Sequence, residues 1–166
     1  MCNLRLQLDK ARTAANSLLS GGPASPGLAH VVAAIDHFRA ALTRSTGRPL
    51  LEEAELQLLG YKAGGSYRRH CDDAPGLSIG QTGRQVRRSV SVLVYLTDDD
   101  WSVERDGGAL RVFPPKGSSG PHVDVPPLPG SLVVFDSATI PHEVLTTHRP
   151  RIAVAGWLQE ARDRGP

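Results

Sequence analysis

Cysteine is scarce in this chain, and long apolar runs are missing from it. The 166 residues include 2 cysteines, Cys2 and Cys71, which are too few for a disulfide framework or a cysteine-rich zinc cluster. No apolar run approaches the ~20 residues that cross a bilayer, which excludes a transmembrane helix. The first residues, Met1 to Arg5, are interrupted by polar side chains and show no cleavage pattern. We therefore expect no secretory signal, no membrane partner and a reducing, cytoplasmic location.

Charge of one sign is also lacking, because the formal net charge is only +2. Basic and aromatic residues are not interleaved, so we expect no nucleic-acid partner. Five arginines lie close together in the sequence, and they form either a solvated face or a patch that attracts an acidic peptide: Arg68, Arg69, Arg84, Arg87 and Arg88. The hydrophobic fraction of 40% and the charged fraction of 22% are typical of a folded protein, and the length fits one domain, residues 1–166.

The order of elements predicts helices first and strands afterwards. Apolar residues recur at helical spacing in residues 4–19 and 26–42, so we expect an N-terminal helical support over residues 1–48. Strand patterns follow at residues 55–61, 89–96, 109–113, 131–135, 142–145 and 152–158. We find no helical pattern between these strands, which argues against a βαβ fold. The pattern predicts a β-sandwich or barrel with helices on one side.

Two His-x-Asp pairs are the first candidates for metal ligands. Residues two apart in a strand share a face, so either pair could offer two ligands to one ion. His122 and Asp124 lie inside a segment rich in proline and glycine that we expect to be a loop, residues 114–129, and Asp124 is only 18 residues before His142. Asp72, which follows His70 by two residues, lies 70 residues before His142, which leaves room for several intervening strands. The spacing therefore favours His70, Asp72 and His142 as a two-histidine, one-carboxylate site for ferrous iron.

Several segments in order resemble one enzyme family. They are YKAGGSYRRHCD at residues 61–72, RSVSVLVYLT at 88–97, GGALRVFP at 107–114, and PGSLVVF at 129–135 followed by His142, Arg151 and Trp157. This sequence resembles the iron(II)- and 2-oxoglutarate-dependent oxygenases, and within them the prolyl 4-hydroxylases. Arg151 stands where collagen-type members carry lysine, so the chain looks more similar to the cytosolic oxygen-sensor and bacterial types. We interpret Gly107 and Gly108 as backbone geometry and not as ligand contacts.

The resemblance implies a fold and a set of site residues. The fold would be α+β, a double-stranded β-helix (a cupin-like jelly roll) over residues 50–160 with the N-terminal helices packed on one sheet. His70, Asp72 and His142 would bind Fe(2+), and Arg151 would bind the distal carboxylate of 2-oxoglutarate, a task that suits a guanidinium. Tyr95 would donate its hydroxyl to the same carboxylate. Tyr61 and Trp157 would line the cosubstrate pocket.

The resemblance also implies a reaction. Such an enzyme hydroxylates an unactivated C–H with O2 and converts 2-oxoglutarate to succinate, with ascorbate as a reductant. The implied substrate is a prolyl residue of a protein or peptide. Three alternatives stay open: the same chemistry on a free amino acid, another small molecule or a damaged base; a non-catalytic binding module on the same fold; and a cupin-type metal protein without 2-oxoglutarate.

Overall fold

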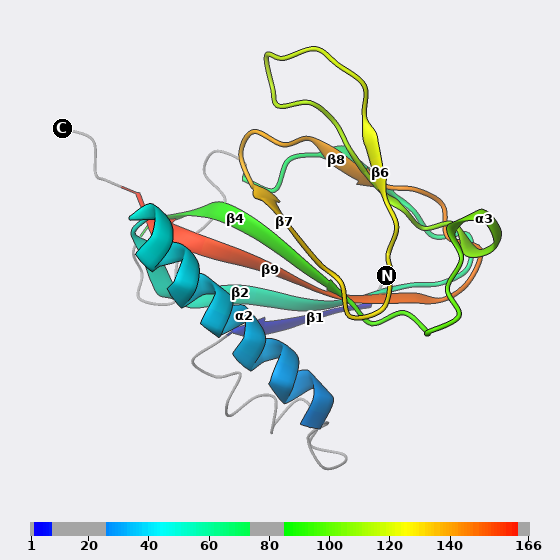
Figure 1. Cartoon of the computed structure of the whole chain (residues 1–166), viewed down its shortest axis with the longest axis horizontal. Helices are drawn as coiled ribbons and strands as arrows, with labels where there is room; N and C mark the ends of the chain where they lie inside the picture. Colours follow the sequence, from blue (N-terminus) through cyan, green and yellow to red (C-terminus); the bar gives the residue numbers. More distant parts are fainter. Residues whose placement is uncertain (1, 8–25, 74–84, 163–166) are drawn as a thin grey trace.

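The computed structural model describes residues 2–7, 26–73 and 85–162, with only the backbone described for residues 2–7. Over these residues the chain forms two antiparallel sheets and a long helix, shown in Figure 1. The elements are β1 (Cys2–Gln7), α2 (Pro26–Thr46), β2 (Leu50–Tyr61), β3 (Tyr67–His70), β4 (Val86–Tyr95), α3 (Val103–Asp106), β5 (Leu110–Val112), β6 (Val123–Val125), β7 (Leu132–Asp136), β8 (His142–Val144) and β9 (Arg151–Ala161). No helix among the described residues is long and apolar enough to span a membrane.

The larger sheet has the strand order β1-β2-β9-β4-β7, and the smaller one has the order β3-β8-β5-β6. Strands distant in sequence are neighbours, because β9 pairs with both β2 and β4. Two antiparallel sheets with such crossovers, and a helix on one of them, confirm the predicted jelly roll. The division into a support over residues 1–48 and a core over 50–160 stays a prediction.

Helix α2 lies across the outer face of the larger sheet (Figure 1). Pro26 stands at its first position, where the missing N–H costs nothing, and Gly47 follows its last residue with a φ of 70°. Its apolar stripe, including Val32 and Ile35, packs on Leu56, Val92 and Val154 of the sheet. We call this surface of the larger sheet the helix face. The prediction of a helix beginning near Pro26 is confirmed.

The opposite surface of the same strands points toward the smaller sheet, and we call it the cavity face. In a strand the side chains alternate, so the odd-numbered residues of β9 from Arg151 to Trp157 lie on this face, and Val154 and Leu158 lie on the helix face. Apolar residues of both sheets, including Tyr61, Leu110 and Val144, pack between the sheets. This region ends at the polar residues of the candidate site.

The N-terminal segment differs from its prediction. Residues 2–7 form strand β1, which pairs with β2 from Cys2↔Gly60 to Gln7↔Glu55, so the predicted helix is wrong there. The reason is visible in the sequence, where Leu4 and Leu6 alternate with Asn3 and Arg5, a period of two that the longer helical pattern masked. The rest of that predicted helix lies outside the described residues.

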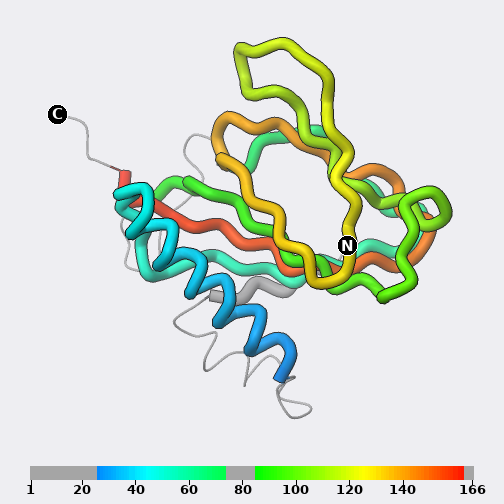
Figure 2. Tube along the Cα trace, viewed as in Figure 1, coloured from blue at the N-terminus to red at the C-terminus, as the bar shows by residue number. Residues whose placement is uncertain are grey.

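The segment predicted as a loop contains a short strand. Residues 123–125 form β6 and pair with β5, so the loop prediction is wrong for Asp124, although the flanking prolines confine the strand to three residues. The turn before β6 extends away from the rest of the molecule in Figures 1 and 2. His122 lies directly before the strand, and its ring centroid is 5.9 Å from that of Phe113.

Candidate active site

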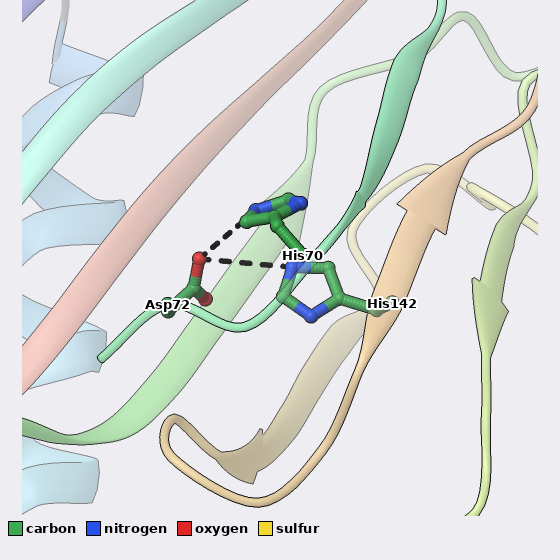
Figure 3. A group of neighbouring side chains, drawn as sticks. All are labelled: His70, Asp72 and His142. Carbon is green, nitrogen blue, oxygen red and sulfur yellow. Dashed lines mark ion pairs between the residues drawn. The ribbon is translucent and has the colours of Figure 1, made fainter. Parts of the chain in front are cut away.

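His70, Asp72 and His142 come together where β3 ends and β8 begins (Figure 3). The two histidines are direct partners across the β3–β8 pair. Asp72 Oδ1 lies 3.2 Å from His70 Nε2 and 3.7 Å from His142 Nε2. One atom from each residue falls within 4.8 Å of the other two, a spacing that suits a shared metal ion. The structure therefore brings together the three residues that the spacing favoured.

The far nitrogen of each imidazole is held by the backbone. His70 Nδ1 lies 2.9 Å from the Arg68 carbonyl oxygen, and His142 Nδ1 lies 3.2 Å from that of Ile140. A proton donated from Nδ1 to these carbonyls directs Nε2 toward Asp72 in both residues. Histidines that bind metals commonly donate their other N–H in this way. Both carbonyl partners are two residues upstream of the histidine, and neither could be recognised from the sequence.

The electrostatics of the three residues suit a divalent cation. Burial raises the pKa of Asp72, but hydrogen bonding to His70 and Ser91 and the charge of His142 outweigh it, so its pKa is lowered and the carboxylate stays ionised. Burial lowers the pKa of His142 in spite of Asp72. For His70, burial lowers the pKa, yet the hydrogen bond to Asp72 raises it above its usual value. An anionic carboxylate beside two imidazoles is a donor set that ferrous iron accepts.

Arg151, at the start of β9, is fully buried with 0% of its surface exposed. None of its three guanidinium nitrogens has a hydrogen-bond partner among the residues that the structure describes, and the buried Tyr95 hydroxyl has none either. The guanidinium carbon lies 4.8 Å from the Tyr95 ring centroid and 5.3 Å from that of Tyr61. A buried cation without an anion costs several kcal/mol, so an anionic ligand would stabilise this corner of the fold.

The pKa shifts of Tyr61, Tyr95 and Arg151 leave all three side chains as hydrogen-bond donors. Burial raises the pKa of Tyr95 and of Tyr61, and the charge of Arg151 offsets only part of the rise, so both phenols keep their protons. Burial lowers the pKa of Arg151, although the two tyrosines counteract it. A guanidinium beside two phenolic O–H groups fits a carboxylate, which accepts hydrogen bonds from both types of donor.

The His-Asp-His group and Arg151 line one cavity of about 430 Å³. Its walls include the three residues of the His-Asp-His group, Arg151, Tyr61 and Trp157. Tyr95 lies against Arg151, behind the lining. Apolar residues complete the walls on both sheets, among them Leu59, Leu93, Leu110 and Val144. A cavity that joins a metal-binding group to an anion-binding corner can hold a small dicarboxylate between them.

Gly107 and Gly108 shape the backbone next to Arg151. Both have positive φ angles, 64° and 74°, which favour glycine. A Cβ on Gly108 would lie 3.0 Å from Arg151 Cδ and 3.2 Å from Thr147, so the glycine allows the guanidinium stem to pass. This close approach agrees with the interpretation of the pair as backbone geometry.

Arg88 has a role that the sequence did not indicate. Its guanidinium donates to both oxygens of Glu55, at 3.1 and 2.8 Å, and to the Asp72 carbonyl at 3.3 Å, and it stacks on the Trp157 ring at 3.8 Å. Arg87 in turn pairs with Glu160. Arg88 is therefore held in an ion pair, and Arg87 is paired while it stays exposed. The interpretation of the arginines as a solvated face or a peptide-attracting patch stays a prediction. Arg68 and Arg69 are exposed, and Arg84 lies outside the described residues.

The second His-x-Asp pair is placed elsewhere. Asp124 accepts two hydrogen bonds from Arg111, at 2.7 and 2.8 Å, within the β5–β6 pair. Among the described residues, the one group of histidine, cysteine and acidic side chains with metal-binding spacing is His70, Asp72 and His142. The distance along the chain to His142 thus distinguished the His-x-Asp motif of the site from the second one.

A comparison with known families decides the family. The profile of the 2OG-Fe(II) oxygenase superfamily matches residues 56–159, more than half of the chain. The chain belongs to this superfamily. Its match begins within β2 and ends within β9, so it includes every residue of the candidate site.

Known proteins place the chain near the prolyl hydroxylases of the 2OG-Fe(II) oxygenases. It is similar to the crystal structure of a Pseudomonas putida prolyl-4-hydroxylase, with 28% identity, a TM-score of 0.72, and 97% of this chain and 73% of that one covered. It is 33% identical over 72 residues to a Caenorhabditis elegans hypoxia-inducible factor prolyl hydroxylase, which is 43% of this chain and 10% of that protein. The chain thus spans about a tenth of this curated relative.

A third similarity concerns the fold alone. A Trichoplax adhaerens prolyl hydroxylase in complex with a hypoxia-inducible factor peptide shares 23% identity and a TM-score of 0.58, with 79% of this chain and 55% of that chain covered. The predicted resemblance to the prolyl hydroxylase group is confirmed by the family match and the bacterial structure together.

Proposed function

We propose that the chain is an iron(II)- and 2-oxoglutarate-dependent dioxygenase that hydroxylates a prolyl residue of a peptide or protein. The observation that supports it most strongly is Arg151, a fully buried guanidinium without a partner among the described residues, in the wall of the cavity that also holds the His-Asp-His group. A metal protein without an anionic cosubstrate would gain nothing from this costly arrangement. The Arg151 corner thus favours 2-oxoglutarate over the cupin-type alternative.

Each site residue has a proposed role. His70 Nε2, Asp72 Oδ1 and His142 Nε2 hold the iron, with the ring orientations fixed through Nδ1. Iron(II) with 2-oxoglutarate supplies the capacity to use O2 for hydroxylation of an unactivated C–H, with succinate as coproduct. Arg151 grips the distal carboxylate of 2-oxoglutarate and Tyr95 donates its hydroxyl to it. Tyr61 and Trp157 form walls that orient the cosubstrate and restrict water.

The prolyl substrate is supported by the names of the relatives, which are prolyl hydroxylases. Exposed Tyr67 lies at the cavity, edge-on to His70 at 4.6 Å, and offers an apolar surface to a substrate ring. A peptide library screened for a mass gain of one oxygen atom tests this choice. Oxidation confined to free amino acids or other small molecules would overturn the peptide assignment and keep the chemistry.

The site itself is tested by an anaerobic titration of the metal-free protein with iron(II) and then 2-oxoglutarate. A visible charge-transfer band should form in the wild type. It should be lost in Asp72→Ala and His142→Ala, and it should require more 2-oxoglutarate in Arg151→Ala. A folded protein that binds iron without the band would overturn the cosubstrate role. A band without substrate-dependent succinate formation would favour the non-catalytic module.

Two further parts of the proposal are ascorbate as a reductant and a cytoplasmic location. Ascorbate should prolong turnover in repeated assays without changing the initial rate, and an equal decline of activity with and without it would contradict its role. Localisation of a tagged chain by microscopy tests the second part. Fluorescence confined to a membrane or to the medium would contradict it.

A further inference from the structure

Two buried serines lie behind the carboxylate of Asp72. Ser91, on β4, is 1% exposed, and its Oγ donates to Asp72 Oδ2 at 2.6 Å. Ser137, just after β7, is 0% exposed, and its Oγ lies 2.8 Å from Ser91 Oγ. The resemblance assigned a role to neither serine.

The direction of the hydrogen bonds follows from the proton count. A serine hydroxyl has one proton to donate, and that of Ser91 goes to the carboxylate, which is ionised and can only accept. The Ser137 hydroxyl must therefore donate to Ser91. The chain runs from Ser137 to Ser91 to Asp72 Oδ2, and successive hydrogen bonds of this kind strengthen one another.

Ser137 also fixes the backbone beneath the carboxylate. Its carbonyl oxygen accepts the N–H of Asp72 at 2.9 Å and that of Asp73 at 3.0 Å, and its own N–H donates to the Ser89 carbonyl at 3.2 Å. Asp72 lies two residues after the end of β3, where regular strand pairing has ended. The serines therefore replace the sheet as the support of this residue and tie it to β4 of the larger sheet.

The two oxygens of Asp72 consequently have different surroundings. Oδ2 is taken by Ser91, and Oδ1 faces the Nε2 atoms of His70 and His142 at 3.2 and 3.7 Å. A carboxylate held in this way offers one oxygen to a metal ion. A two-oxygen grip would occupy a position that a facial triad leaves open for other ligands.

We propose that Ser91, backed by Ser137, is a positioning residue that holds Asp72 as a one-oxygen metal ligand. This inference rests on the proposed function, because it takes Asp72 to be a ligand. Groups that orient metal ligands typically contribute about 10–100-fold in metal affinity. Ser91 donates its hydroxyl proton to Asp72 and acts on the metal through this residue.

The test measures metal binding in the absence of turnover. Metal-free wild type, Ser91→Ala, Ser91→Thr and Ser137→Ala are titrated with Mn(II) by calorimetry, and their Co(II) complexes are compared by visible absorption. Ser91→Ala should bind Mn(II) about 10–100-fold more weakly and change the Co(II) spectrum. Ser91→Thr, which keeps the hydroxyl, should restore both, and Ser137→Ala should show a smaller loss.

Ser89→Ala is a matched control on the same strand. Ser89 is also buried, and its hydroxyl donates to a carboxylate oxygen at 2.7 Å, but this carboxylate is that of Glu160 and not that of Asp72. The substitution keeps the Ser89 carbonyl that accepts the N–H of Ser137. It should lower the thermal midpoint and leave Mn(II) affinity unchanged. If Ser91→Ala does not fold, Ser137→Ala and Ser91→Thr still decide the matter, through a loss in the first and its absence in the second.

The outcomes separate this inference from the proposed function. Wild-type binding that is lost in Asp72→Ala but unchanged in Ser91→Ala and Ser137→Ala would overturn the serine role alone. A wild type that binds no Mn(II), or an Asp72→Ala variant that binds it as tightly, would overturn both. Equal weakening in Ser89→Ala would reduce the effect to lost packing and overturn the positioning role.

Discussion

The two faces of the larger sheet are formed by the same strands and meet opposite surroundings. On the helix face, Leu56, Val92 and Val154 are fully buried against α2. On the cavity face, Arg151 is buried just as completely, yet its guanidinium has no partner among the described residues. Burial of the apolar side chains on the helix face stabilises the fold, and burial of the Arg151 charge on the cavity face costs part of that stability. Stability and function are thus separated by the alternation of side chains within single strands.

The largest effect is expected from Arg151→Met, which fills the volume and removes the charge. The affinity for 2-oxoglutarate should fall by roughly 2–5 kcal/mol, since one partner of a buried charge pair is lost. The free energy of unfolding of the cosubstrate-free protein should rise by about 1–4 kcal/mol, because an unpaired buried charge is gone. Calorimetry and chemical denaturation measure the two quantities. Activity lost with stability gained is the trade-off typical of active sites.

Arg151→Lys is the matched control, because it keeps the charge but not the two-pronged guanidinium geometry. It should keep part of the 2-oxoglutarate affinity and gain none of the stability. A methionine variant that is less stable than the wild type would break the comparison, since Arg151 would then stabilise the fold.

On the helix face, Ile35→Ala should have the reverse effect. Ile35 is 2% exposed between α2 and the sheet, so its truncation should lower the free energy of unfolding by about 2–5 kcal/mol. Mn(II) and 2-oxoglutarate affinities, measured well below the thermal midpoint, should stay unchanged. His37→Ala, at an exposed position of the same helix, is the control and should change neither. Loss of cosubstrate affinity in Ile35→Ala would show that the two faces are coupled.

A smaller effect is expected from Gly108→Ala, which disturbs the cavity face indirectly. The new Cβ would press on Arg151 Cδ, so the KM for 2-oxoglutarate should rise more than kcat falls. The positive φ also costs about 1–3 kcal/mol of stability in any non-glycine residue. Gly117→Ala separates the two causes, because Gly117 has a φ of +84° with no atom within 4 Å of a Cβ. Equal KM values in both variants would contradict the contact with Arg151.

The parts of the fold that the sequence predicted are those governed by local periodicity. The apolar stripe of α2 and the valine-rich β4 could be recognised because each pattern is complete within its own element. Strand β1 was missed because its period of two covers only six residues and the pattern continues into a longer helical one. Which strands become neighbours, such as β9 between β2 and β4, depends on contacts that no local pattern contains.

The site shows the same division. His70, Asp72, His142 and Arg151 could be proposed because family motifs and their order mark them. Their supports could not, since Ser91 and Ser137 are separated by 46 positions, and Arg88 reaches Glu55 across the intervening strand β9. A serine in a strand or an arginine in a basic run has many ordinary roles. Only the folded arrangement shows which carboxylate each one holds.

The smallest effect is expected at the neighbour of Arg151. Ile152 lies on the other side of the strand and is 43% exposed. Ile152→Thr keeps a β-branched side chain, so the free energy of unfolding should change by less than about 0.5 kcal/mol. Binding of 2-oxoglutarate should also stay unchanged. Adjacent positions of β9 would then give the largest and the smallest effects of the series, and a clear loss of cosubstrate affinity in Ile152→Thr would mean that position along the strand, and not the face, decides function.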